Sequence, residues 1–310
     1  MTRDQQAAAQ PYAAMSERTG IWLVFGSALA WSFGGVFSRY LDPSIDVWTV
    51  VFWRSFWAAA FLFAFMLWRD GPRGTLALIT AMRLPSFAVA LCFATASTSF
   101  VVALSHTTVA NILLMQAGVP LIAALISWVL FREKVNRATA IAIALVILGV
   151  AVMVSQSLTG KISPIGDALA LLISFAFAIA TIITRRYAHV RMVPAVFLGI
   201  ALAGAIGFFN APSLSVTSGG MAILFGFGAV NLGAGLALFV TGARFVPAAM
   251  TALIGVAEPV LGPIWVWLFH SEVPSTSTMI GGAIVMAALL WHVTRELLAH
   301  DRKRVLPPAA

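Results

Sequence analysis

The stretch WVLFRE at residues 128–133 returns 139 residues later as WLFHSE at residues 267–272. The same offset brings Pro120 onto Pro259 and Thr139 onto Thr278. A shared pattern at one constant offset indicates an internal duplication. We therefore expect the chain to consist of two similar halves.

The composition places both halves in a membrane. Of 310 residues, 61% are hydrophobic and 10% are charged, whereas a soluble domain carries about 25% charged residues. The single cysteine, Cys92, excludes an intramolecular disulfide and a multi-cysteine metal site. A net charge of +8 would suit nucleic acid, but basic loops beside anionic lipid explain it in a membrane protein. We expect membrane lipid, and no nucleic acid, as a partner.

Ten apolar runs are long enough to cross a bilayer, since a spanning helix needs about 20 residues. They lie at residues 20–38, 45–68, 84–104, 108–131, 138–154, 165–184, 193–209, 219–240, 247–269 and 276–297. For the first run the alternative is a signal peptide over residues 21–30. The apolar run continues past that point through Trp31 and Phe33, which favours a span.

The positions of lysine and arginine support ten spans. All but three of the 19 Lys and Arg residues fall in the N-terminal tail, in every second loop after it, or at the C-terminal end. The exceptions are Arg39 and Lys161 in the intervening loops and Arg54 inside the second span. The positive-inside rule then predicts that both termini are cytoplasmic.

Five spans in each half is an odd number, so the second half must cross the membrane in the opposite orientation. We expect an all-α integral membrane protein of ten helices in two inverted five-helix repeats, residues 20–155 and 165–297. Residues 156–164 would link them, and residues 1–19 and 298–310 would form cytoplasmic tails. Inverted repeats are typical of secondary transporters, which alternate access around a site near the midplane.

Three features carry a resemblance to a known family. They are Glu258-Pro259 in the ninth span, the two matching span endings at residues 128–133 and 267–272, and Arg54-Ser-Phe in the second span. Over residues 20–297 the chain resembles the EamA-type members of the drug/metabolite transporter superfamily. It departs from the pattern in the first half, where Val119-Pro120 stands in place of the Glu-Pro often found there.

The overall look is similar to the aromatic amino-acid exporters of that family. The resemblance implies export of aromatic and other neutral amino acids, or of related amphipathic metabolites or drugs, across the inner membrane. An uptake or exchange carrier for another small metabolite is the alternative. A channel and an intramembrane enzyme are less favoured alternatives.

Two charged residues lie deep in predicted spans. Glu258 is 11 residues into the ninth span, about 16 Å along a helix and close to the midplane. A carboxylate there could accept a substrate ammonium, carry a coupled proton or pair with a cation. Arg54, near mid-depth in the second span, needs a partner because its guanidinium stays charged. We expect either an Arg54–Glu258 pair or an Arg54 bonded to backbone carbonyls and water.

The remaining candidates are polar or aromatic residues within spans. Besides Glu258, the predicted substrate-binding residues are Trp31, Thr95, Ser99, Asn111, Gln116, Asn231 and Trp265. Helix packing is the alternative role for each. Pro120 and Pro259 are predicted hinges, because proline removes a backbone hydrogen bond and favours a kink. Glu133 and Glu272 end their helices and are expected to cap or pair with the next helix.

No arrangement of residues indicates catalysis, a cofactor or a metal site. No soluble segment is long enough to bind ATP, so transport would be secondary or facilitative. The expected ligand is a small molecule. A monomer is possible, because ten spans suffice for a complete carrier, and a dimer stays open.

Overall fold

The computed structural model describes residues 17–132, 137–158, 164–187, 190–246 and 248–305, and helices are the only regular elements in these ranges. In the first half the helices are α2 Glu17–Ser32, α3 Gly34–Tyr40, α4 Val47–Thr80, α5 Leu84–Leu104, α6 Val109–Gln116, α7 Val119–Phe131 and α8 Arg137–Leu158. In the second half they are α9 Pro164–Arg186, α10 Val193–Asn210, α11 Ser218–Phe225, the π-helix η1 Gly226–Ala234, α12 Gly235–Gly242, α13 Ala248–Gly255, α14 Ala257–His270 and α15 Thr276–Val305.

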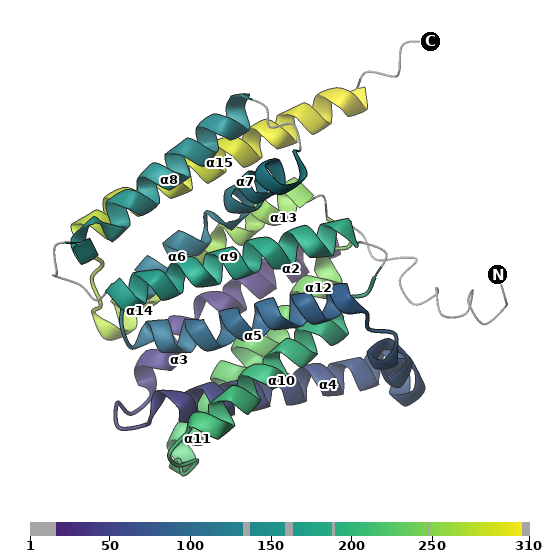
Figure 1. Ribbon diagram of the computed structural model, residues 1–310, viewed down its shortest axis with the longest axis vertical. Coiled ribbons are helices and arrows are strands. Elements are labelled where there is room, and N and C mark those ends of the chain that lie inside the picture. The colour runs from purple at the N-terminus through teal and green to yellow at the C-terminus, as the bar shows by residue number, and fades with distance from the viewer. Residues whose placement is uncertain (1–16, 133–136, 159–163, 188–189, 247, 306–310) are drawn as a thin grey trace.

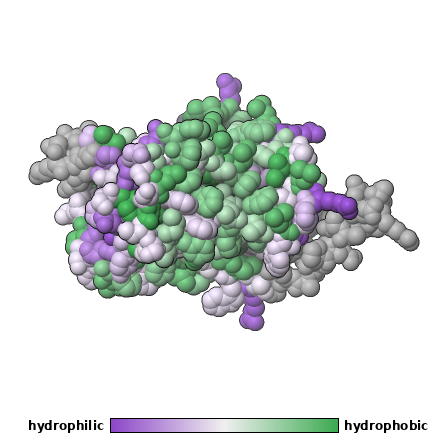
Figure 2. Space-filling model, turned by 90° about the horizontal axis from the view of Figure 1, so that it is seen from below, coloured by the Kyte–Doolittle hydropathy of each residue, from purple (hydrophilic) through white to green (hydrophobic). Residues whose placement is uncertain are grey.

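The helices form a bundle of membrane-spanning length. Within the described ranges, nine helices are long and apolar enough to cross a membrane, and the bent pair α6–α7 makes a tenth. The main helices run across the molecule roughly side by side (Figure 1). On the face seen in Figure 2, hydrophobic side chains dominate the middle and hydrophilic ones gather toward the two ends. The prediction of an all-α protein with ten spans is confirmed.

The two halves interlock rather than sitting apart. Helix α8 packs against α15, α5 against α9 and α4 against α10, and each pair joins one half to the other. Figure 1 shows α8 and α15 side by side along one edge of the bundle. Gly149 and Gly281 allow this approach, because a β-carbon on Gly149 would lie 2.7 Å from the carbonyl oxygen of Gly281. Helix pairs in lipid commonly meet at such small residues.

Several helix limits differ from the sequence prediction. Helix α4 was expected to end near residue 68 but continues to Thr80, across a break at Gly71 (φ 68°, ψ 170°) followed by Pro72. The positive φ suits glycine, and the chain resumes a helix that hydropathy alone did not mark. Helix α15 likewise continues to Val305. Of the predicted linker, residues 159–163 lie outside the described ranges, as do Glu133 and residues 1–16.

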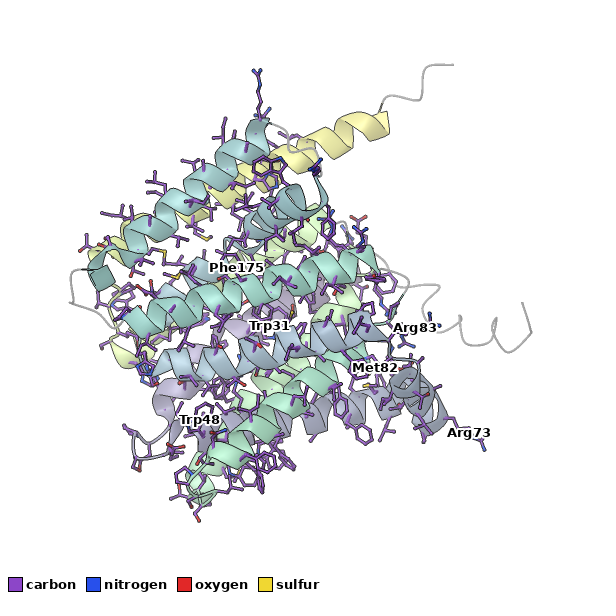
Figure 3. The ribbon with its side chains drawn as sticks, in the orientation of Figure 1. Trp31, Trp48, Arg73, Met82, Arg83 and Phe175 are labelled. Carbon is purple, nitrogen blue, oxygen red and sulfur yellow. The ribbon has the colours of Figure 1, made fainter. Side chains whose placement is uncertain are left out.

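The helix ends define two faces of the bundle. We call one the basic face, because Arg18, Arg83, Arg137 and Arg186 lie at the helix ends that meet there. The other, the opposite face, includes Arg39 in the last turn of α3. In Figure 3, Arg73 and Arg83 lie at one end of the bundle, Trp48 lies at the other, and Trp31 and Phe175 lie between them.

The buried core is divided unequally between these faces. One large cluster joins the helix halves next to the opposite face, including Val36 of α3, Val51 of α4, Leu104 of α5, Ile112 of α6 and Val266 of α14. The halves next to the basic face form three separate clusters instead, around Leu289, Leu62 and Ile122. The bundle is therefore packed as one unit at the opposite face and as several groups at the basic face.

Candidate functional site

Two helices are broken at equivalent positions in the two halves. Helix α6 ends at the C-cap Ala117, and α14 begins after the N-cap Val256, which is the position 139 residues later. Pro120 stands in the first turn of α7 and Pro259 in the first turn of α14. Neither proline can donate the backbone hydrogen bond that would continue the preceding helix. The predicted kink near Pro120 is present, with a bend of 44° between α6 and α7. Near Pro259 the structure shows an interruption at Val256, within a stretch from Met250 to His270 that counts as one candidate span.

Glu258 lies in the first turn of α14, directly after one of these breaks. Its side chain is partly exposed. No ion pair or hydrogen bond of its carboxylate is found among the residues that the structure describes. A carboxylate at a helix N-terminus is favoured by the helix dipole, so the break favours a negative charge at Glu258 although no cation lies beside it among the described residues.

The expected Arg54–Glu258 pair does not form. Arg54 is 5% exposed, and its Nη1 donates to the hydroxyl of Ser97 at 3.1 Å. The guanidinium lies 4.5 Å from the ring centroid of Phe227 and 5.2 Å from that of Phe100. Aromatic faces attract a cation in a dry environment, which is why Arg54 is held by α5 and η1 rather than by α14. Among the described residues, no printed hydrogen bond joins Arg54 to a backbone carbonyl, and the predicted contact with water stays a prediction.

An aromatic pair lies at the break between α2 and α3. Trp265 stacks on Phe33, with ring centroids 5.2 Å apart and planes 9° apart. Its indole Nε1 donates to the hydroxyl of Ser32 at 3.0 Å. Trp31 instead contacts Phe239 at 5.4 Å between ring centroids. Trp265 shares α14 with Glu258, seven residues further on, so an aromatic surface and a carboxylate lie along one helix.

Asn231, a predicted substrate-binding residue, makes a structural contact. It is 3% exposed, and its Nδ2 donates to the carbonyl oxygens of Ala30 at 2.6 Å and Trp31 at 3.1 Å. The interruption of the first span after Ser32 frees these carbonyls from their normal helical partners. Asn231, in the π-helix of the eighth span, satisfies them. Both of its N–H groups are used, which favours the packing role that was the alternative for Asn231.

The predicted substrate-binding residues Thr95 and Ser99 both lie on α5. Ser99 is buried and Thr95 is partly buried, but the α5 hydroxyl that binds a charged group is Ser97, on another side of the helix. Gln116 lies at the end of α6, and its Nε2 is buried with no partner among the described residues. Gln116 therefore remains a candidate for a ligand contact at the break.

A polar cleft at the opposite face brings together residues that sequence reasoning separated. Its volume is about 370 Å³, and Arg39, Asn111, Asp167 and Thr278 are among its lining residues. Asn111, a predicted substrate-binding residue, donates here through Nδ2 to Asp167 and to Thr107. Asp167 was missed, although an acidic residue in the first turn of a long apolar helix is itself a signal.

Arg39 and Glu272 close the cleft on one side as an ion pair, which we call the latch. The Nε of Arg39 donates to Oε2 of Glu272 at 2.7 Å, and its Nη1 donates to the carbonyl oxygen of Leu104 at 2.8 Å. Glu272 Oε1 accepts the backbone N–H of Val109 at 2.9 Å. The latch thus ties the end of α14 to α3, α5 and α6. Glu272 caps α6, not the helix that follows it.

The exposed carboxylate of Asp42, near the opposite face, is stabilised by a backbone hydrogen bond. The pKa of Asp42, in the turn after α3, lies below its ordinary value because the backbone N–H of Ser44 donates to the carboxylate at 2.8 Å. A carboxylate stabilised in this way stays ionised.

The fold and its helix breaks define a multi-pass membrane protein of two inverted repeats with polar groups held at interrupted spans. The model of the EamA-like transporter family matches residues 18–155 and 164–294. The chain therefore belongs to the EamA-like transporter family, within the drug/metabolite transporter superfamily, and is a membrane transporter.

A solved structure titled "Crystal structure of protein" is similar to this chain, with a TM-score of 0.63 and 18% sequence identity. The match covers 89% of this chain and 97% of that one. At this identity the likeness shows the fold alone. A search of curated proteins finds no match.

Proposed function

We propose that the protein is a secondary transporter that exports aromatic and other neutral amino acids, or related amphipathic metabolites or drugs, across the cytoplasmic membrane. The observation that carries this proposal is Glu258, a carboxylate without a cation partner among the described residues, at a helix break on the same helix as the stacked Trp265. A carboxylate with aromatic faces along one helix suits an ammonium group joined to an apolar body.

Arg54 supplies the complementary charge in the proposed mechanism. Its Nε is buried and has no partner among the described residues, and one hydroxyl and two rings hold the guanidinium. A buried cation without an anion is costly, so a substrate carboxylate that approached Arg54 would be bound strongly. Arg54 and Glu258 would then recognise the two ends of a zwitterion during part of the cycle.

The unequal packing of the two faces supports alternating access. A single core joins the helices at the opposite face, whereas three clusters share the basic face. A carrier closed on one side and parted on the other would have such a core. In this proposal the basic face is cytoplasmic, by the positive-inside rule, and the broken helices at Pro120 and Pro259 bend as the molecule switches.

The test is substrate flux in proteoliposomes. Vesicles with purified protein and empty vesicles receive phenylalanine, tryptophan, tyrosine, threonine and methionine, each with and without a pH gradient. Saturable flux of this class above the empty vesicles supports the proposal, and its dependence on the gradient identifies proton coupling. Absence of saturable flux, with the protein shown to be folded, would overturn the amino-acid assignment.

A further inference from the structure

Arg54 is a buried cation without an anion beside it in the described part of the chain. Its side chain is 5% exposed, in the apolar stretch of α4 between the N-cap Asp46 and Arg69. No ion pair of Arg54 is found among the residues that the structure describes. Because a guanidinium stays charged and an isolated charge within a span is costly, this position favours a counter-charge.

The guanidinium and its neighbour on α5 present donors that lack acceptors. A guanidinium carries several N–H groups and no acceptor. One hydrogen bond of Arg54 is found in the described ranges, from Nη1 to the hydroxyl of Ser97 at 3.1 Å, and its Nε is buried without a partner there. The Ser97 oxygen accepts this bond, so its own O–H can donate to a further acceptor. The groups at this point are therefore suited to an acceptor that carries negative charge.

Two aromatic rings hold the cation without neutralising it. The guanidinium carbon lies 4.5 Å from the ring centroid of Phe227 and 5.2 Å from that of Phe100. The face of a ring attracts a cation through its quadrupole, but the ring carries no net charge. Phe227 is fully buried, so this side of the guanidinium is apolar. The whole positive charge of Arg54 therefore remains to be balanced.

Close packing fixes the arrangement. Phe227 belongs to the π-helix η1, a geometry that is rare and often found at functional sites. A β-carbon on the next residue, Gly228, would collide with the carbonyl oxygen of Arg54 and would lie 2.7 Å from Cβ of Trp57. Helix η1 is thus pressed against α4 at the level of Arg54. Preorganised donors of this kind bind a ligand at low cost in conformational entropy.

We propose that Arg54 and Ser97 form a binding site for a small monovalent anion, which chloride occupies when no substrate is bound. One negative charge balances the single positive charge, whereas a divalent anion would leave a net charge within the span. A substrate carboxylate has the same charge as chloride and competes with it for Arg54. This competition rests on the function proposed above, but the binding of chloride itself does not.

The test is equilibrium binding of radioactive chloride to the full-length protein in nanodiscs of neutral lipid, with gluconate keeping the ionic strength constant. We expect saturable binding that 3-phenylpropionate displaces. Phenethylammonium, which has the same ring but no carboxylate, should not displace it. Absence of saturable chloride binding, or displacement by phenethylammonium, would overturn the anion site. Chloride that 3-phenylpropionate cannot displace would refute the shared use of Arg54.

Two matched variants locate the binding. Arg54→Gln removes the charge and keeps a polar side chain, and we expect the affinity for chloride to fall about tenfold or more. Arg73→Gln makes the same change at an exposed position of the same helix and should leave the affinity unchanged. Equal affinities in the two variants would overturn the assignment to Arg54.

A third variant serves if Arg54→Gln proves unstable. Ser97→Ala keeps the positive charge and removes the hydroxyl that lies beside it. We expect the affinity for chloride to fall about threefold or more, because one hydrogen bond to the anion is lost. An unchanged affinity in a folded Ser97→Ala protein would overturn the proposed site.

The two proposals fail separately. Amino-acid flux by the wild type without saturable chloride binding would refute the anion site and leave the transport function standing. Arg54-dependent chloride binding without amino-acid flux would keep the site and refute the assigned substrate.

Discussion

At the residue scale, Glu258 is the side chain on which the proposed chemistry depends. We predict that Glu258→Gln lowers saturable flux by roughly tenfold or more, because a charge-assisted hydrogen bond contributes about 1.5–3 kcal/mol. Glu17→Gln makes the same chemical change on the exposed first turn of α2 and should transport normally. Flux is measured in proteoliposomes at equal protein content. Wild-type flux in Glu258→Gln would remove this residue from both binding and coupling.

A second prediction at this scale concerns Asn231 and the stability of the folded protein. Asn231→Ala leaves the carbonyl oxygens of Ala30 and Trp31 without the donor that now binds them. We expect the free energy of unfolding to fall by about 1–3 kcal/mol, seen as a lower melting temperature in detergent. Asn210→Ala is the control, since Asn210 is exposed and its side chain donates to the carbonyl oxygen of Ile206 in its own helix. Equal melting temperatures for the two variants would contradict the structural role.

At the element scale, we expect Pro259 to maintain the break between α13 and α14, because it cannot donate a backbone hydrogen bond. Pro259→Ala restores an N–H where the helix is interrupted, so we expect a more continuous helix and a lower transport rate in a folded protein. Pro263 lies inside α14, away from the break, and Pro263→Ala should reduce the rate less. The comparison uses initial rates for the two variants side by side. A larger loss for Pro263→Ala would show that the break is not where the helix bends.

The latch between Arg39 and Glu272 holds four helices together at the opposite face. Glu272→Gln removes the ion pair and keeps an acceptor for the backbone of Val109. We therefore expect spin labels at Ser44 and Val273, one in the turn after α3 and one in the turn after α14, to gain a population at longer distance. Double electron–electron resonance measures this distribution. The same labels with Glu17→Gln form the control, and an unchanged distribution in Glu272→Gln would show that the latch does not hold this face closed.

Hydropathy predicted most elements because a span is decided by about 20 consecutive residues. The exceptions have local causes. The helix after Gly71 is not a span and carries no continuous apolar run. The break after Ser32 contains no proline, and it becomes visible only through Asn231, some 200 residues away. The breaks at Pro120 and Pro259 were predictable because proline itself lacks the backbone N–H that a continuous helix needs.

At the scale of the whole molecule, the candidate site was less predictable than the fold. Arg54 was expected to find Glu258 because both are charged and deep, yet two phenylalanine rings and Ser97 hold it. The cleft at the opposite face depends on Asp167, Asn111 and Arg39, which come from three different spans. Depth along a helix can be counted from sequence, but the direction in which each helix faces its neighbours depends on packing.

In the proposed mechanism the inverted repeat gives this packing a functional meaning. One continuous core at the opposite face and three clusters at the basic face would then correspond to one end of a cycle in which the two halves exchange roles. In such a carrier the binding site must face the original side of the membrane again, empty or loaded, before the next molecule crosses, whereas a channel has no such step.

The most direct test of transport by alternating access is counterflow. Proteoliposomes loaded with unlabelled phenylalanine are diluted into a trace of labelled phenylalanine, and the accumulation of label is followed over time. The account predicts a transient accumulation above equilibrium that disappears in empty vesicles and is strongly reduced in Glu258→Gln. Label that only equilibrates, at a rate independent of the unlabelled phenylalanine inside, would contradict it.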